Sequence, residues 1–278
     1  MAATLAWGGQ PCQDASVPRH TIPDGTTIGF DEAGGGEATP IVFLHGVGSD
    51  KSVWRPQLEH FGKSRRALAF DYPGYGDSDP AIRGTTRDDY AAIILAVLKD
   101  LGVQRAHICG LSLGGVVAIA MNHAAPERCA SLILADTFAV HPEGRAIYER
   151  SLTGSENLPA MAEARVDILL AQPAAPRVRR EVVETMSRIS PAAYCIGAEA
   201  VWLADQRARA GAINVPTLVL VGDQDLVTPP ELSNELVDLI PDARMQVIEE
   251  AGHLSNVERP DDFNRIVEAF LSGVDSAA

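Results

Sequence analysis

The stretch Gly110-Leu111-Ser112-Leu113-Gly114 constrains the fold of this chain more than any other. It follows a short apolar run, 106–109, that predicts a buried strand, and it precedes an apolar run of small residues, 115–120, that predicts a buried helix. In such a tight strand-to-helix turn the serine adopts a strained backbone conformation, and side chains in place of the two glycines would collide with the neighbouring strand and helix. The serine hydroxyl is thereby pushed clear of the sheet at a helix N-terminus. We therefore predict a nucleophile at Ser112, the alternative being a glycine-rich turn with an idle serine.

Strands and helices alternate along the chain on both sides of this turn. Several predicted strands are continuous apolar runs, which are typical of strands buried on both faces of a parallel sheet. The pattern predicts an α/β fold with a mostly parallel eight-stranded sheet flanked by helices. The expected strands cover 17–20, 26–30, 41–44, 67–70, 106–109, 131–135, 216–221 and 245–248.

The alternation stops after the sixth strand. From 137 to 213 no strand is expected; two amphipathic helices are, around 158–169 and 178–189, and Ser190-Pro191 is typical of the start of a third. We therefore predict a helical cap at 137–213, inserted into a hydrolase-like core made of 18–136 and 214–273. Residues 1–17 are expected to form a flexible N-terminal tail.

Composition limits the partners of this protein. Its formal net charge of −14 should repel nucleic acid and anionic membrane surfaces, and no apolar run is long enough to span a bilayer. Cys12, Cys109, Cys129 and Cys195 are scattered without pairing or metal-ligand spacing, and the first residues lack the features of a signal peptide. We expect reduced thiols, a cytoplasmic location, and a monomer or homodimer that binds neither nucleic acid nor membrane.

Four further motifs follow predicted strands in a characteristic order. They are His45-Gly46-Val47-Gly48, Asp71-Tyr72-Pro73-Gly74-Tyr75-Gly76-Asp77-Ser78, Gly222-Asp223-Gln224-Asp225 and Gly252-His253-Leu254. With these motifs and the central turn, residues 18–272 resemble the α/β-hydrolase superfamily, and the stretch 252–260 is most similar to the 3-oxoadipate enol-lactonases and their esterase relatives. The resemblance implies a serine hydrolase with a helical cap.

The order of motifs also assigns roles. Ser112 is the expected nucleophile, and His253 the base that takes its proton and returns it to the leaving group. Asp225 is the expected acid that orients the imidazole. Asp223, two residues earlier, and Asp136, after the sixth strand, are the alternatives for this acid.

An oxyanion hole requires two backbone N–H groups, one from the residue after the nucleophile and one from the loop after the third strand. These are the N–H groups of Leu113 and Val47. We expect His45, Asp71 and Asp77 to be structural, bonding to neighbouring loops.

The sequence predicts neither metal nor cofactor, because it contains no His/Cys/Asp/Glu cluster with ligand spacing and no nucleotide-binding glycine motif. By position, the expected apolar lining of a substrate pocket is Phe138, Trp202, Val227 and Leu254.

The charge of the predicted cap differs from that of the rest. It contains nine arginines, no lysine and nine acidic residues, so its formal charge is zero and the whole −14 lies outside it. One interpretation is that the arginines form surface pairs such as Arg177–Glu181 and Arg180–Glu184. The other is that a cap arginine faces the pocket and binds the carboxylate of an anionic substrate.

Together these features predict a serine hydrolase that cleaves a carboxylic ester or lactone of a small molecule through an acyl-enzyme. A C–C bond hydrolase of a vinylogous diketone and a cofactor-free perhydrolase use the same triad, so both remain open. A hydrolase-fold ligand receptor is the alternative outside enzymes, and it would show at most very slow, nearly single-turnover cleavage.

Overall fold

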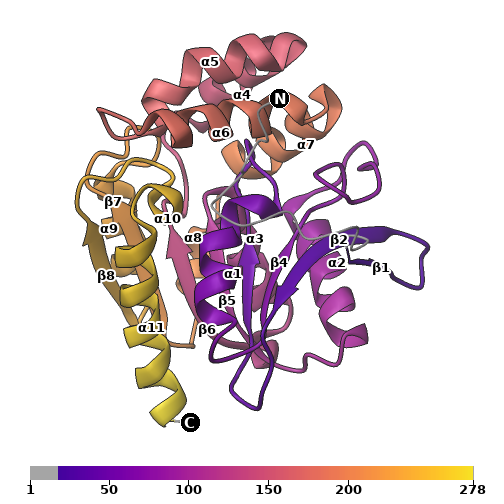
Figure 1. Cartoon of the computed structure of the whole chain (residues 1–278), viewed down its shortest axis with the longest axis vertical. Coiled ribbons are helices and arrows are strands. Elements are labelled where there is room, and N and C mark those ends of the chain that lie inside the picture. Colours follow the sequence, from indigo (N-terminus) through magenta and orange to yellow (C-terminus); the bar gives the residue numbers. More distant parts are fainter. Residues whose placement is uncertain (1–17, 278) are drawn as a thin grey trace, which may run out of the picture.

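A single eight-stranded sheet forms the centre of the computed structural model, which describes residues 18–277 (Figure 1). The predicted tail, 1–17, lies outside the described residues. The strand order is β1-β2-β4-β3-β5-β6-β7-β8, with β2 antiparallel to both β1 and β4 and the other neighbours parallel. The predicted fold class is therefore confirmed. The strands are β1 Arg19–Thr21, β2 Thr27–Ala33, β3 Ile41–Leu44, β4 Ala67–Phe70, β5 Ala106–Leu111, β6 Cys129–Ala135, β7 Thr217–Gly222 and β8 Ala243–Ile248.

Burial explains the sequence of each strand. Every residue of β3, β4, β5, β6 and β7 is buried, because helices cover both faces of the sheet there. Continuous apolar runs are the expected sequence for such strands. The two edge strands, β1 and β8, contain exposed residues on one or both faces.

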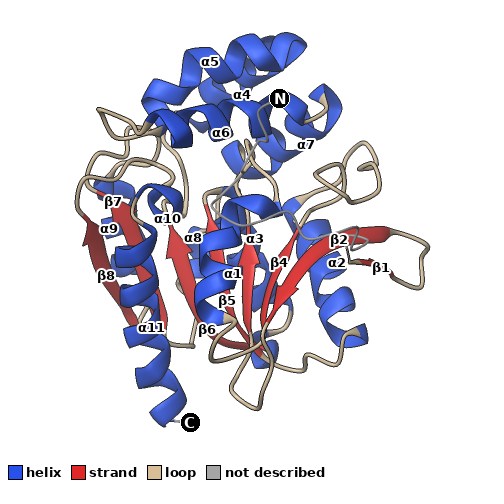
Figure 2. Cartoon of the chain, viewed as in Figure 1, coloured by secondary structure: helices blue, strands red, loops and turns tan. Residues whose placement is uncertain are grey.

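Helices pack on both faces of the sheet (Figure 2). Their apolar residues and those of the sheet form two cores, one with α2, α3 and α9 and the other with α1 and α11. The helices of these layers are α1 Arg55–Phe61, α2 Arg87–Asp100, α3 Leu113–Ala124, α9 Pro230–Leu239 and α11 Pro260–Ala277, with short turns of helix at η1 Lys51–Trp54, η2 Pro126–Arg128, α8 Arg207–Ala210 and α10 Ser255–Glu258.

The chain between β6 and β7 is mostly helical, and its first four α-helices lie beyond the carboxyl ends of the parallel strands, whereas α8 packs beside the sheet against α3 and α9 (Figure 1). The helices expected there form, and the Ser190 hydroxyl accepts a hydrogen bond from the Ala193 N–H (3.2 Å) as the N-cap of α7. The sequence did not predict α4, in which only Gly144 and Ser151 are buried. We call α4–α7 the cap helices; they are α4 Gly144–Gly154, α5 Leu158–Leu169, α6 Pro176–Arg188 and α7 Pro191–Trp202, with η3 Ser155–Asn157 between the first two.

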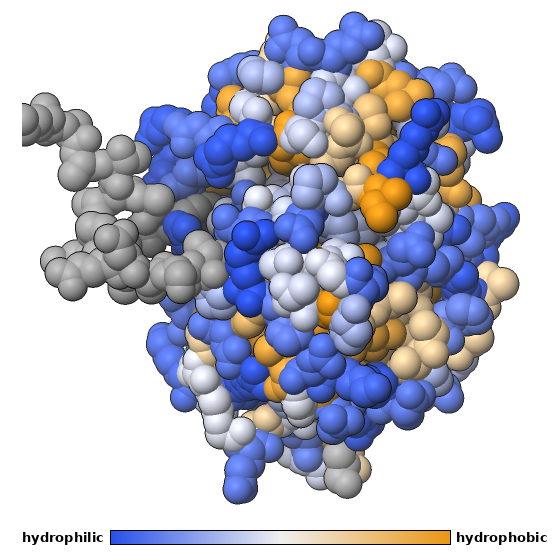
Figure 3. Space-filling view, turned by 90° about the vertical axis from the view of Figure 1, so that its right-hand side faces the viewer, coloured by the Kyte–Doolittle hydropathy of each residue, from blue (hydrophilic) through white to orange (hydrophobic). Residues whose placement is uncertain are grey.

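The surface carries few large apolar side chains. The face in Figure 3 is mostly hydrophilic, with hydrophobic side chains in small groups. None of the helices in 18–277 has the length and hydropathy needed to cross a membrane. The large exposed apolar residues that the structure describes are Ile82, Leu152, Ile168, Leu226 and Val247.

Candidate active site

Ser112 occupies the sharp turn between β5 and α3. Its backbone has φ 55° and ψ −113°, a conformation that residues with a side chain rarely adopt. A Cβ at Gly110 would overlap the Gly114 carbonyl, and a Cβ at Gly114 would overlap the Leu44 carbonyl of the adjacent strand β3. The steric reason for both glycines is thus visible in the fold, and it fixes the serine at the head of α3.

His253 and Asp225 lie in direct contact. Nδ1 of His253 is 2.9 Å from Oδ2 of Asp225, and both side chains are buried. Asp225 sits in the turn after β7, where its Oδ1 accepts hydrogen bonds from the N–H groups of Val227 (2.8 Å) and Thr228 (2.9 Å). The His253 N–H donates to the Leu169 carbonyl at the end of α5 (2.8 Å). Both partners are therefore held by backbone as well as by each other.

Thr228 is a member of this site that the sequence analysis missed. Its hydroxyl donates to Oδ2 of Asp225 (2.6 Å) and lies 3.2 Å from Nδ1 of His253. A threonine three residues after an aspartate in a turn is a signal for such a bond. Thr228 fixes the carboxylate that faces the imidazole.

The environment favours the charged forms of this pair. Burial alone would lower the pKa of His253, but the Asp225 carboxylate outweighs burial and raises it. Burial alone would raise the pKa of Asp225, but His253 and the Thr228 hydrogen bonds lower it. An imidazolium that forms during a reaction is thus stabilised where it forms.

The two alternative acids make other contacts. Asp136, at φ 46°, accepts hydrogen bonds from the Gly222 N–H (2.9 Å) and the Ser255 hydroxyl (2.6 Å), and joins β6 to β7 and α10. Its burial, together with the nearby Asp225 charge, raises its pKa to about 8. Asp223 accepts a hydrogen bond from the Ala251 N–H (3.2 Å), which ties the loop after β7 to the loop that carries His253. Of the three acids, Asp225 is the one that the structure places against the imidazole.

Ser112 and His253 line the same cavity, which lies beneath the cap helices. The cavity encloses about 730 Å³ including its open mouth. Three of the residues predicted to line a pocket do so, namely Trp202, Val227 and Leu254. Phe138 does not belong to the described lining, because it is fully buried and stacks on Trp202 with ring centroids 5.8 Å apart. Further lining comes from Gly46, Val47, Gly48, Ser49, Ser52, Val53, Leu111, Arg165, Leu169, Glu181, Val182, Thr185, Met186, Tyr194 and Val257.

The loop 45–50 after β3, which we call the oxyanion loop, passes beside the serine. A Cβ built on Gly46 would lie 3.4 Å from the Ser112 Cβ. Val47 follows in a turn closed by a hydrogen bond from the Ser49 N–H to the Gly46 carbonyl (3.2 Å), and it lines the cavity. Leu113 is the first residue of α3, so its N–H has no acceptor within the helix. Of the two predicted donor residues, Leu113 follows Ser112 directly in the chain, and Val47 lines the same cavity as Ser112.

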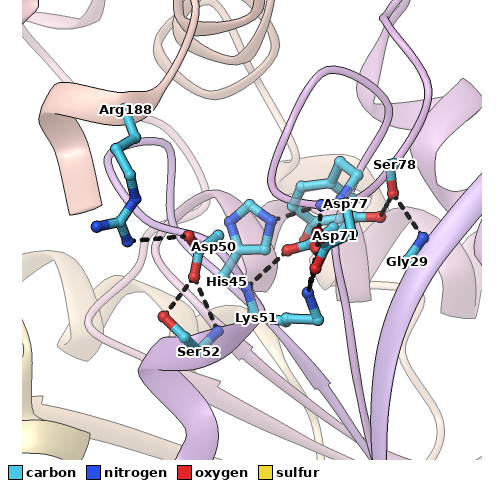
Figure 4. Close-up of polar contacts among 10 residues, drawn as sticks. Gly29, His45, Asp50, Lys51, Ser52, Asp71, Asp77, Ser78 and Arg188 are labelled. Carbon is cyan, nitrogen blue, oxygen red and sulfur yellow. Dashed lines mark hydrogen bonds and ion pairs between the residues drawn. The ribbon is translucent and has the colours of Figure 1, made fainter. Parts of the chain in front are cut away.

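A polar network lies behind this loop (Figure 4). The carboxylate of Asp71, which is fully buried, accepts hydrogen bonds from the backbone N–H of Lys51 (2.8 Å), the Lys51 ammonium (2.8 Å) and the Asp77 N–H (2.9 Å). The Lys51 ammonium also pairs with Asp77. His45 contacts the Gly46 carbonyl through Nδ1 (2.8 Å), and its Nε2 accepts from the Tyr72 N–H (3.5 Å). These contacts match the structural roles expected for His45, Asp71 and Asp77.

One cap arginine reaches the cavity. Arg165 of α5 is part of its lining, and its guanidinium lies 3.5 Å from the Tyr194 hydroxyl. The predicted pair Arg177–Glu181 forms (2.9 Å), whereas the described contacts include none between Arg180 and Glu184. Other arginines between 137 and 213 pair with carboxylates away from the lining, as in Arg179–Glu163, Arg188–Asp50, Arg207–Asp205 and Arg209–Asp88.

Among the described residues, no three or more His, Cys, Asp or Glu side chains lie close enough together to hold a metal ion. Cys109 and Cys129 are buried free thiols, and Cys195 is a free, half-buried one. Cys12 lies outside the described residues.

Comparison with known proteins gives a consistent result. The model of the alpha/beta hydrolase family matches residues 41–266. The chain is 30% identical over 278 residues to the dihydrolipoyllysine-residue acetyltransferase component of the acetoin cleaving system of Pseudomonas putida, with 97% of this chain and 73% of that protein covered. It is 26% identical over 261 residues to 3-oxoadipate enol-lactonase 1 of Acinetobacter baylyi, with 91% and 96% covered. The crystal structure of the enol-lactonase from Burkholderia xenovorans LB400 superposes with a TM-score of 0.86 at 28% identity, with 92% of this chain and 100% of that chain covered.

Proposed function

This chain belongs to the alpha/beta hydrolase family and is a hydrolase, and we propose that it cleaves a carboxylic ester or lactone of a small molecule by a Ser112–His253–Asp225 triad. The observation that carries the proposal is the contact of Asp225 with Nδ1 of His253 at the wall of the cavity that Ser112 also lines. The similarity to an enol-lactonase supports an ester or lactone as the bond that is cleaved.

The reaction proceeds in two halves. His253 accepts the hydroxyl proton of Ser112 as its oxygen attacks the substrate carbonyl, and the imidazolium is stabilised by Asp225. The N–H groups of Val47 and Leu113 hold the oxyanion, aided by the positive end of α3. His253 then protonates the leaving alkoxide. A water molecule, activated by the same imidazole, releases the acid and restores Ser112.

We infer that the substrate carries a carboxylate or another anionic group. Arg165 and Glu181 bring opposite charges to the lining, but Glu181 pairs with Arg177, whereas the described polar contact of Arg165 is the neutral Tyr194 hydroxyl. The rest of the chain is strongly acidic and repels anions, so an anionic substrate requires a local cation to offset that field. Apolar walls from Trp202, Val227 and Leu254 would contact its carbon skeleton.

A turnover screen over short aryl esters, enol lactones and vinylogous diketones tests the proposal. We expect multiple turnovers on an ester or a lactone. Turnover confined to diketones would replace the proposal by C–C bond hydrolysis. Stoichiometric cleavage that then stops would indicate a ligand receptor.

A further inference from the structure

The oxyanion loop is fastened at both of its ends to the segment that follows β4. At its start, the His45 ring packs against the rings of Tyr72 and Tyr75 in tilted arrangements, with ring centroids 4.5 and 4.9 Å away. Immediately after its end, Lys51 binds the Asp71 carboxylate through both its backbone N–H and its ammonium (Figure 4). The donor residue Val47 lies between the two anchors, which together restrict the path of the loop that carries its N–H.

The second anchor is a buried charge pair. The Lys51 side chain is 8% exposed and that of Asp71 is fully buried. Burial alone would lower the pKa of Lys51, but the carboxylates of Asp71 and Asp77 outweigh it and raise the pKa, so the ammonium stays charged. A buried ion pair of this kind contributes little net stability compared with an apolar pair of the same volume, but it specifies one geometry. It is therefore better suited to fixing a loop than to stabilising the fold.

A third contact connects the same loop to the cap. Asp50 accepts a hydrogen bond from the Ser52 N–H (2.9 Å) as the N-cap of η1, and it lies 3.8 Å from the guanidinium of Arg188 at the end of α6. Arg188 is 63% exposed, so solvent screens this contact, and we assign it a minor part.

We propose that Lys51 is a positioning residue for the reaction: paired with Asp71, it holds the oxyanion loop so that the Val47 N–H points at the carbonyl oxygen as this oxygen becomes negatively charged. The inference rests on the proposed function, because it requires an oxyanion. Lys51 itself is not part of the described lining of the cavity, although the next residue, Ser52, is. It acts by pre-organisation, which matters more for the transition state than for the bound substrate.

The test compares Lys51→Met, Lys51→Arg and the control Arg65→Met. Arg65 is a comparably buried cation paired with Asp275 (3.0 Å), but it lies at the opposite end of β4 from Asp71. For each variant we would measure kcat and KM on a neutral aryl ester. We would also measure inhibition by a trifluoromethyl ketone, whose hemiketal oxygen occupies an oxyanion hole, and by the methyl ketone of the same shape, which forms no stable hemiketal. Thermal unfolding reports the fold of each variant.

We expect Lys51→Met to lower kcat about tenfold to hundredfold with little change in KM, less than the 10²–10³ of a deleted oxyanion donor. Trifluoromethyl ketone affinity should fall by the same factor, while methyl ketone affinity stays unchanged. Lys51→Arg should retain most of the wild-type kcat and trifluoromethyl ketone affinity. Arg65→Met should change neither of these two quantities. A folded Lys51→Met protein with wild-type trifluoromethyl ketone affinity would overturn the inference.

If Lys51→Met does not fold, Asp77→Asn serves in its place. Asp77 is 44% exposed, and its replacement weakens the hold on Lys51 while leaving the Asp71 pair in place. A smaller parallel loss in kcat and in trifluoromethyl ketone affinity supports the inference, and no loss in either contradicts it. A wild-type protein that hydrolyses no ester and binds no trifluoromethyl ketone would contradict the proposed function, and with it this inference.

Discussion

Nδ1 of His253 lies 2.9 Å from Oδ2 of Asp225, while the other carboxylate oxygen is occupied by two backbone N–H groups. The carboxylate therefore cannot turn away from the ring without losing bonds that are buried from water. With Nδ1 engaged by Asp225, Nε2 is the nitrogen that remains for the proposed proton transfer from Ser112, and this arrangement determines which changes should affect turnover.

Replacing Ser112 by alanine should abolish turnover and leave the fold intact, because alanine is smaller than serine and the turn already accepts a Cβ at this position. A serine-directed phosphonate should add one adduct to the wild type, counted by mass spectrometry. Equal labelling of Ser112→Ala would show that the nucleophile is another residue.

Asp225→Asn and Asp136→Asn should differ strongly in activity. The first leaves an amide facing Nδ1 and favours the wrong imidazole tautomer, which costs about 10⁴-fold in the serine-protease precedent. The second acts on a side chain that bonds to Gly222 and Ser255, so its loss should be much smaller. The comparison uses kcat of the two variants on one ester. A larger loss for Asp136→Asn than for Asp225→Asn would assign the acid to Asp136, at the end of β6.

Activity should fall on the acid side at a pH above the ordinary histidine pKa of about 6.5. The base must be neutral to accept a proton, and Asp225 outweighs burial and raises the pKa of His253. A profile of kcat/KM against pH on a neutral ester checks this. An acid limb well below 6.5 would contradict the described environment of the imidazole.

The unfolding free energy of the wild type should contain a contribution from Asp136 that decreases with rising pH. Because its folded pKa is raised to about 8 and its unfolded pKa is about 4, the folded state binds more protons between these values. The contribution is complete below about pH 4 and is lost as the pH rises through about 8. The unfolding free energy of Asp136→Asn, measured with urea at several pH values, should therefore vary less with pH than that of the wild type. If the unfolding free energies of the two proteins change with pH in parallel, the pKa of Asp136 in the folded protein is near its ordinary value.

Arg165→Gln should impair the hydrolysis of carboxylate-bearing esters selectively. A charge-assisted contact is worth roughly 1.5–3 kcal/mol, so KM or kcat/KM should change about tenfold to hundredfold, while a neutral ester of equal length is barely affected. Arg180→Gln, on the exposed surface of α6, is the matched control. If Arg165→Gln changes kcat/KM by the same factor for both esters, the cavity arginine does not bind a substrate anion.

Local patterns predicted much of this molecule. The strands, the turn at Ser112 and the order of motifs depend on residues close together in sequence, and the fold of the sheet then brings Asp225 and His253 to the same edge. Chain order and motifs pointed to these positions but left Asp136 and Asp223 as alternatives for the acid, and only the three-dimensional structure shows which of the three contacts the imidazole.

Other features depend on packing that no local pattern encodes. Phe138 was expected in the pocket, but it lies behind Trp202, and only the path of the chain after β6 decides which of the two rings faces the cavity. Nothing in the sequence around Lys51 distinguishes it from an ordinary exposed lysine. Its burial follows from two aspartates that lie 20 and 26 residues away in the sequence. Helix α4 has few buried residues and few apolar ones, so little in its sequence distinguishes it from an exposed loop.

The backbone conformation of Ser112 lowers the stability of the folded protein while it places the hydroxyl at the cavity. A residue with a side chain in this conformation costs on the order of 1–3 kcal/mol, a cost that glycine largely avoids. Glycine at position 112 should therefore give a more durable protein that performs no chemistry. Backbone outliers of this kind are typical of functional sites, so the conformation of Ser112 is itself an argument that its hydroxyl has a function.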